Sequence, residues 1–150
     1  MILNFGSINI DNVYQVSRFP GAGETISAKS LEKILGGKGI NQTIAVQRAG
    51  AAIFHVGHVG KDEWIFDQLS KMEVDKKFIY SCAGVTGHAI IYVDDLGENK
   101  IVIHAGANEQ FKSKQCDEIL EQFKLEKPWV ILQNEINLSL EVAIKAKELG

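Results

Sequence analysis

The sequence predicts an α/β fold in which a mostly parallel, three-layer sheet carries a smaller antiparallel sheet. Two observations lead to this prediction. Short apolar segments of strand length alternate with segments of helical periodicity through most of the 150 residues, which is the pattern of a parallel sheet with helices on both faces. In two places a pair of strand-like segments follows one another without a helix between them, which favours antiparallel pairs that project from the main sheet.

The first third of the chain predicts two strands, a turn and an extended return. Residues 2–10 are apolar at the start and polar at the end, and residues 13–19 alternate as a half-exposed strand does. Residues 20–23, Pro-Gly-Ala-Gly, form a turn sequence, and residues 25–34 return as a short extended segment.

A helix is predicted next, at residues 41–49, because Ile44, Ala45 and Ala49 recur with helical spacing and Gly50 can end the helix. The remaining elements are expected in the order strand 53–56, helix 62–72, strand 78–81, hairpin 86–93 and 100–104, helix 113–123, strand 129–132 and helix 139–149. The run Trp129-Val130-Ile131-Leu132 is continuously apolar, so we expect a strand that is buried on both faces.

The composition is that of one soluble globular domain, with 45% hydrophobic and 23% charged residues. The net charge is −3 and there is no basic run, so nothing indicates a nucleic-acid or anionic-membrane partner. No apolar stretch approaches the length of a membrane span, and the start lacks the basic region of a signal peptide. Cys82 and Cys116 are isolated, so we expect a reduced, cytoplasmic protein.

A glycine cluster, Gly36-Gly37-Lys38-Gly39, precedes the first predicted helix and raises the question of a phosphate loop. The Walker pattern fails because Gly39 follows the lysine where a hydroxyl should bind magnesium. The dinucleotide pattern fails because there is no third glycine, so a nucleotide-binding Rossmann domain is disfavoured. From this fragment alone, a plain loop leading into a helix is as good an interpretation as any function.

The wider spacing is more specific. Gly36-Gly37-x-Gly39-x-Asn41-x-Thr43, followed by Gly50 and Gly60, resembles the first signature of the ribokinase-like (PfkB) carbohydrate kinases. Other segments agree with that family in order and spacing: "GSINID", "RFPGAGET", "TGHAIIYVDDLGENKIVIHAGAN" and "ILQNEI". The resemblance covers essentially the whole chain, and within the family the lysine and the "HAGAN" segment are most similar to the kinases that act on ribose.

The resemblance implies a ribokinase-like fold and ATP-dependent phosphorylation of a sugar hydroxyl, most concretely of ribose to ribose 5-phosphate. It implies that residues 1–150 are the N-terminal, substrate-binding half, with lid strands at about 12–34 and 86–104 that pair in a homodimer. Family members use ATP and Mg²⁺ with K⁺ activation, and their second half carries the ATP pocket and the catalytic Gly-Ala-Gly-Asp motif. We therefore expect a truncated chain with no catalytic, cofactor or metal residue. A kinase for fructose or adenosine, and a non-catalytic sugar-binding or assembly fragment, remain open alternatives.

By the same resemblance, six residues form the sugar site: Asn9, Asp11, Gly37, Lys38, Asn41 and Glu135. Their chemistry suits the task, because sugar hydroxyls both donate and accept hydrogen bonds. Asn9 and Asp11 are two apart at a strand end and point the same way, and Glu135 follows a strand at the carboxyl end, where α/β sheets bind ligands. Each residue alone could be a helix cap, a turn former or a solvated charge, but the ordered set favours a sugar site.

Three further features are interpreted as structural. The segment Gly21-Ala22-Gly23-Glu24 resembles the family's catalytic motif, but it lies between two strand-like segments, so we predict a hairpin turn and no general base. His55 and His58 surround a strand end and face opposite ways, so they do not form a metal site. The apolar run at residues 129–132 would leave an open sheet edge in this chain, which predicts self-association.

Overall fold

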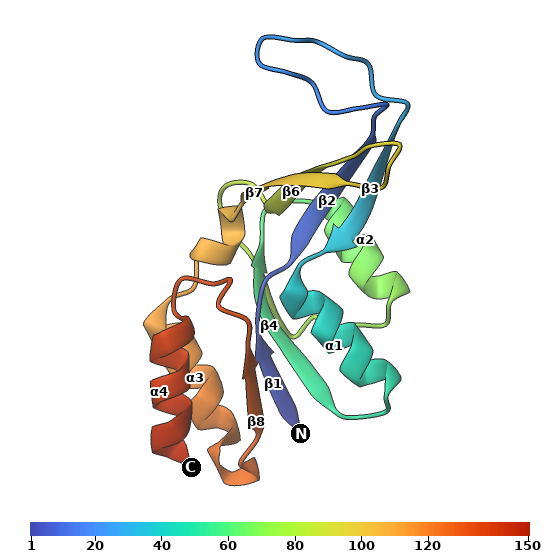
Figure 1. Ribbon diagram of the computed structural model, residues 1–150. Coiled ribbons are helices and arrows are strands. Elements are labelled where there is room, and N and C mark those ends of the chain that lie inside the picture. Colours follow the sequence, from blue (N-terminus) through green and yellow to red (C-terminus); the bar gives the residue numbers. More distant parts are fainter.

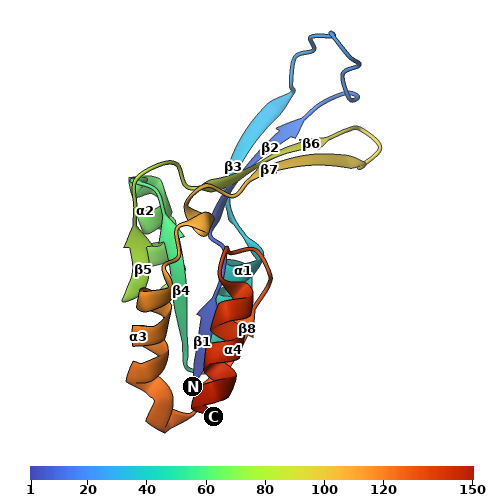
Figure 2. The same ribbon diagram turned by 90° about the vertical axis from the view of Figure 1, so that its left-hand side faces the viewer.

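The computed structural model describes residues 1–150 and contains two four-stranded sheets, one projecting from the end of the other (Figures 1 and 2). The main sheet is parallel, in the order β5 (Phe78–Ser81), β4 (Ile53–Val59), β1 (Ile2–Phe5) and β8 (Trp129–Leu132). The projecting sheet has the order β3 (Ser30–Gly36), β2 (Asn9–Gln15), β6 (Gly87–Val93) and β7 (Asn99–His104). The predicted α/β class is confirmed.

Helices cover both faces of the main sheet, which gives the three predicted layers (Figure 1). One face carries α1 (Lys38–Arg48) and α2 (Glu63–Lys71), and the other carries α3 (Ser113–Phe123) and α4 (Ser139–Leu149). Two short 3₁₀ turns, η1 (Gly106–Glu109) and η2 (Lys124–Glu126), flank α3. The apolar core is accordingly divided into two clusters, one centred on Leu3 and Phe5 and the other on Ile8 and Ile40.

The single strand predicted at residues 2–10 is wrong, because the chain leaves one sheet and enters the other within it. β1 ends at Phe5 and β2 begins at Asn9. Between them the Gly6 amide donates to the Val56 carbonyl (3.1 Å) in the main sheet, whereas the Ile8 amide donates to Asn108 Oδ1 (3.0 Å). The switch of the backbone from the main sheet to the projecting sheet leaves no mark on the pattern of apolar residues. Residues 2–10 therefore resemble a single strand in the sequence.

The projecting sheet consists of the two predicted hairpins, β2–β3 and β6–β7, both antiparallel. They are joined by parallel pairing of β2 with β6, so the sheet is mixed rather than purely antiparallel. The strands expected at 13–19 and 25–34 are shorter or displaced. The Val16 amide makes the last bond to β6, at Val93 O (2.9 Å), and β6 then turns away at Asp94, so the chain beyond Val16 has no neighbouring strand.

Helix α1 begins at Lys38, before the predicted start at Asn41. Its buried face therefore differs from the predicted one, because Ala45 and Ala49 are exposed. The residues that face the sheet are Gly39, Ile40 and Thr43. The early start depends on Gly39, since a Cβ at that position would lie 2.6 Å from the Gly6 backbone.

Strand β8 lies at the edge of the main sheet and pairs only with β1. The prediction that residues 129–132 are buried on both faces is therefore wrong for this chain: Trp129 is 79% exposed and the other three are half-buried. Nearby, Leu140 and Ile144 of α4 are also exposed. This edge is open and apolar, as expected from its sequence. None of the helices has both the length and the apolar character needed to cross a membrane.

Candidate functional site

The structure brings the six predicted site residues together around one cavity of about 170 Å³, where the projecting sheet meets the carboxyl ends of the main-sheet strands. The cavity is lined by Asn9, Asp11, Gly37, Lys38, Asn41 and Glu135, with an apolar wall of Ala89, Ile91, Ile101 and Ile103 from β6 and β7. Pockets for drug-sized ligands are larger, roughly 300–1,000 Å³. The polar side chains of the lining suit a small molecule that carries hydroxyl groups.

Asp11 offers the cavity a carboxylate with no partner inside the chain. Asp11 lies on β2 opposite Ile34 of β3, and its carboxylate lies over Gly36, where any Cβ would collide with it. Partial burial and the negative charge of Glu135 both raise the pKa of Asp11 above its ordinary value. Since no hydrogen bond of the protein offsets these effects, its oxygens remain available as acceptors for a ligand.

Glu135, in the loop after β8, is held from two sides. Its Oε2 accepts from Ser7 Oγ (2.6 Å) and from the Lys38 amide (3.4 Å), and its Oε1 pairs with the Lys38 ammonium. Partial burial opposes ionisation, but the hydrogen bonds from Lys38 and Ser7 prevail and hold the pKa of Glu135 below its ordinary value. The carboxylate is thus a charged and oriented acceptor, while the exposed Lys38 side chain can move to make room for a ligand.

Asn9 is oriented by a second asparagine. Asn108, in η1, donates through Nδ2 to Asn9 Oδ1 (2.7 Å) and accepts through Oδ1 from the Ile8 amide (3.0 Å). Both side chains are buried. Because the amide oxygen of Asn9 is engaged, its NH₂ group is the part left to donate toward the cavity.

The glycine cluster brings backbone segments close to one another. Gly37 has φ 105° and would place a Cβ 2.8 Å from the Ser7 carbonyl oxygen, so both its conformation and its surroundings require glycine. Asn41 lies in the first turn of α1, where its amide donates to Gly37 O (3.1 Å) while its side chain lines the cavity. The cluster therefore seats the start of α1 against the segment that links β1 to β2.

Sequence reasoning missed two polar residues of the site, Ser7 and Asn108, and the apolar wall. Ser7 stands inside "GSINID" and Asn108 ends "HAGAN", so both lie in segments that resemble the family. Their positions became apparent only from their contacts, because each acts by orienting another side chain, Glu135 or Asn9.

The features interpreted as structural lie away from the cavity. Glu24 is in the exposed loop between β2 and β3, where it pairs with Arg18. His55 and His58 are buried on opposite faces of β4, and the His58 ring packs against Phe111 with centroids 4.5 Å apart. This geometry agrees with the predicted structural roles.

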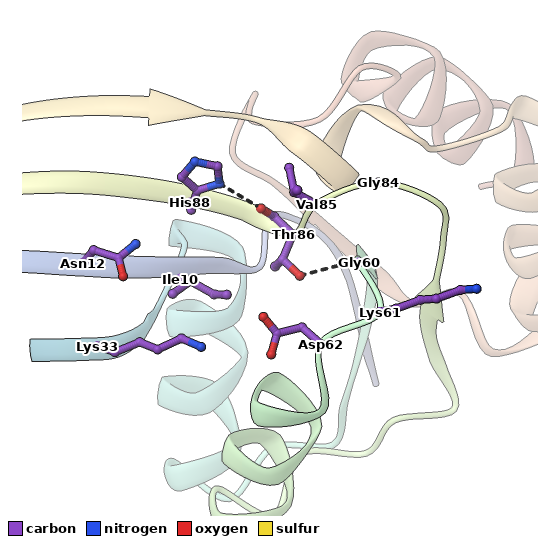
Figure 3. Close-up of a pocket in the computed structure, with 10 residues that line it drawn as sticks. All are labelled: Ile10, Asn12, Lys33, Gly60, Lys61, Asp62, Gly84, Val85, Thr86 and His88. Atoms are coloured by element: carbon purple, nitrogen blue, oxygen red, sulfur yellow. Dashed lines mark hydrogen bonds between the residues drawn. The ribbon is translucent and has the colours of Figure 1, made fainter.

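A larger cavity, of about 400 Å³, lies on the opposite face of the projecting sheet (Figure 3). Side chains alternate along β2, so Ile10 and Asn12 line this cavity while Asn9 and Asp11 line the other. Figure 3 shows Lys61 directed away from the space, and the Gly60 amide donates to Thr86 Oγ1 (3.0 Å) across its edge. None of the six predicted residues lines this cavity. It lies between the projecting sheet and the residues that lead into α2.

Comparisons with known proteins agree with the sequence resemblance. A family model described as pfkB family carbohydrate kinase matches residues 1–146. A ribokinase of Lactococcus lactis is 35% identical over 143 residues, which cover 93% of this chain and 47% of that protein.

Solved structures give the same result. A ribokinase from Giardia lamblia superposes with a TM-score of 0.85 and 35% identity, covering 99% of this chain and 47% of that one. An Arabidopsis thaliana ribokinase complexed with ribose and ATP also gives 0.85, with 32% identity, covering 99% of this chain and 50% of that one. The chain thus spans about half the length of the relatives it matches.

Proposed function

The chain belongs to the pfkB family of carbohydrate kinases, and we propose that it supplies the sugar-binding half and the lid of an ATP-dependent kinase that converts ribose to ribose 5-phosphate. The observation that carries this proposal is the convergence of Asn9, Asp11, Gly37, Lys38, Asn41 and Glu135 on one small cavity. The lid is the projecting sheet, β3-β2-β6-β7. The similarity to ribokinases over nearly the whole chain supports ribose as the sugar.

The residues of this chain would bind and orient the sugar. Asp11 accepts hydrogen bonds from hydroxyls, and the Asn9 NH₂ group donates to them. Glu135 accepts once Lys38 moves aside, and Lys38 can then donate to the same ligand. The apolar wall from β6 and β7 packs against the C–H groups of the sugar ring. Closing this wall over the ligand excludes water, which would otherwise compete with the sugar hydroxyl for the phosphoryl group.

We assign no residue of this chain to ATP or to its metal ion. No group of three or more His, Cys, Asp or Glu side chains lies close enough to hold a metal, and the only glycine cluster before a helix packs on the chain itself. We therefore derive no step of phosphoryl transfer from these residues. We propose that ATP, Mg²⁺ and K⁺ are held by a second half like that of the longer relatives.

Two further parts of the proposal concern partners and location. Strand β7 is exposed along its whole length, and Ile101, Val102 and Ile103 are 50%, 64% and 60% exposed. We propose that the lid of a second copy covers this strand in a homodimer. Cys82 and Cys116 are free thiols, which suits a cytoplasmic protein.

Isothermal titration calorimetry of the 150-residue chain with ribose, fructose and adenosine tests the proposal. We expect measurable ribose binding and at least tenfold weaker binding of the other two. A folded chain that binds fructose or adenosine more tightly than ribose would change the substrate, and one that binds none of the three would refute the sugar-site assignment. Adding ATP, Mg²⁺ and K⁺ should give no ribose 5-phosphate, since the phosphoryl-transfer residues lie elsewhere. Product formation would overturn that expectation.

A further inference from the structure

A chain of buried and half-buried polar side chains crosses the interface between the main sheet and α1. We call it the polar ladder; its members are Gln133, Asn4, Thr43 and His55, from the end of β8, from β1, from α1 and from β4. Asn4, Thr43 and His55 are each at most 1% exposed. Burying polar groups costs free energy unless they are hydrogen-bonded. The contacts of this set offset part of that cost, while His55 Nε2 and Gln133 Oε1 have no partner.

Asn4 is the centre of the ladder. Its Nδ2 donates both to the Gly39 carbonyl (2.7 Å) and to Thr43 Oγ1 (2.8 Å), which are two groups of the first turns of α1. Its Oδ1 accepts from Gln133 Nε2 (2.6 Å). The Asn4 amide therefore uses both donors and its acceptor to tie α1 and the end of β8 to the central strand.

The link between Thr43 Oγ1 and His55 Nδ1, 2.8 Å long, takes its direction from the tautomer of the ring. Thr43 Oγ1 accepts from Asn4, and its own proton is free to donate to His55 Nδ1. In that arrangement His55 carries its proton on Nε2, an atom without a hydrogen-bond partner of its own. Complete burial lowers the pKa of His55 to about 4, so the ring is neutral near pH 7 and can accept this bond.

None of the four ladder residues lines the sugar cavity. What they hold is the turn that carries Gly37, Lys38 and Asn41. Gln133 also donates to Gln42 Oε1 of α1 (2.8 Å), and it lies two residues before Glu135 in the sequence. The ladder thus connects the two main-sheet segments of the site, the start of α1 and the loop after β8, through residues outside the lining of the cavity.

We propose that the polar ladder positions the first turn of α1 against the loop that carries Glu135, and so sets the affinity of the site for its sugar. This inference rests on the proposed function for its effect on the ligand, but its effect on the turn is independent of it. Asn4, Thr43, His55 and Gln133 are positioning residues: they act through Gly39 and the helix start. An apolar interface could hold α1 on the sheet equally well, but it would not fix the direction of the turn through oriented bonds.

Thr43→Val tests the ladder, because it keeps the shape of the side chain and removes the hydroxyl. Hydrogen exchange is followed at two amides of the turn, Ile40 (bonded to Ser7 O, 3.0 Å) and Asn41 (bonded to Gly37 O, 3.1 Å). The amide of Val74, bonded to Leu69 O (3.0 Å), is the reference outside the turn. We expect at least tenfold faster exchange at Ile40 and Asn41, with Val74 unchanged. Thr43→Ser, which keeps the hydroxyl, should behave within twofold of the wild type, and Thr25→Val in the exposed loop is the matched control.

The same variants are titrated with ribose. We expect the Kd to rise at least fivefold in Thr43→Val and to be restored in Thr43→Ser. Unchanged exchange in the turn, or equal acceleration at Val74, would show that the ladder only stabilises the core and would overturn the proposal. Local acceleration with an unaltered Kd would overturn its link to affinity. If the wild type binds no ribose, the proposed function is refuted. The hydrogen-exchange rates at Ile40 and Asn41 still test whether the ladder positions the turn.

A measurement on the unaltered protein covers the case in which Thr43→Val does not fold. The ¹⁵N resonances of the His55 ring should show a neutral imidazole protonated at Nε2 at pH 7. A ring protonated at Nδ1, or a cationic ring, would reverse or break the Thr43–His55 link and overturn the ladder as described.

Discussion

Replacing Asp11 with alanine removes the one site carboxylate that has no hydrogen bond within the chain. The folded protein gains nothing from this charge, since burial and Glu135 both disfavour it and raise its pKa. A carboxylate whose ionised form is disfavoured by the folded protein, and which has no hydrogen bond within it, is best explained by hydrogen bonds to a ligand. The variant should therefore lose binding without losing stability.

The magnitude follows from the groups involved. A hydrogen bond to a charged group contributes about 1.5–3 kcal/mol, and a ligand hydroxyl left unpaired adds to the loss. For a half-buried carboxylate that accepts two hydroxyls we expect a loss of about 2–4 kcal/mol, which is about a 30- to 700-fold increase in the Kd for ribose. Asp11→Asn, which keeps one acceptor oxygen, should fall between the wild type and Asp11→Ala.

Calorimetric titration with ribose, together with thermal unfolding of the same samples, gives both quantities. Asp67→Ala is the matched control, because Asp67 is an exposed aspartate on α2. The Tm of Asp11→Ala should be no lower than that of the wild type at pH 7. If folded Asp11→Ala bound ribose within twofold of the wild type, the reasoning that places the sugar against this carboxylate would be refuted.

Three other outcomes are expected. Gly39→Ala should lower the free energy of unfolding by more than about 2 kcal/mol in urea, because its Cβ would meet the Gly6 backbone; Gly21→Ala in the open loop should change it by less than about 0.5 kcal/mol. The pKa of His55 is lowered from 6.5 to about 4, so the unfolded state binds more protons between these values and stability should fall as the pH drops from 6.5 to 4. The loss attributable to this ring is roughly 3 kcal/mol, and it should be missing from the pH profile of His55→Gln. Light scattering should show association of the wild-type chain that increases with concentration and is reduced in Trp129→Lys; a wild-type chain that stays monomeric at high concentration would contradict the open-edge argument.

The sequence predicted the order of the elements because strand and helix periodicity is contained within a dozen residues. The six site residues were predicted by the resemblance to the carbohydrate kinases, whose motifs are short and can be recognised in the sequence alone. The glycine–asparagine spacing carries Gly37, Lys38 and Asn41, and the segments "GSINID" and "ILQNEI" carry Asn9, Asp11 and Glu135. The structure brings these residues to one cavity, although their role as sugar ligands stays a prediction.

The rest depended on contacts between distant segments. The parallel pairing of β2 with β6 joins residues that no local pattern relates, and the division of residues 2–10 between two sheets leaves the apolar pattern continuous. Residues 129–132 have the apolar composition of a central strand, but they form β8 at the edge of the main sheet. The polar ladder was missed for a similar reason. Asn4, Thr43 and His55 are far apart in the sequence, and their hydrogen bonds form only when β1, α1 and β4 pack together.

The crossing at Gly6–Ile8 divides the candidate site between two bodies. Asn9 and Asp11 belong to the projecting sheet, whereas Lys38 and Glu135 belong to the main sheet and its connections. A sugar bound between them would cross-link the two sheets, so the angle between the sheets and the occupancy of the cavity would depend on each other. If the projecting sheet acts as the proposed lid, anything that favours its closure, such as the proposed second copy on β7, would tighten sugar binding by the same free energy with which the sugar favours closure.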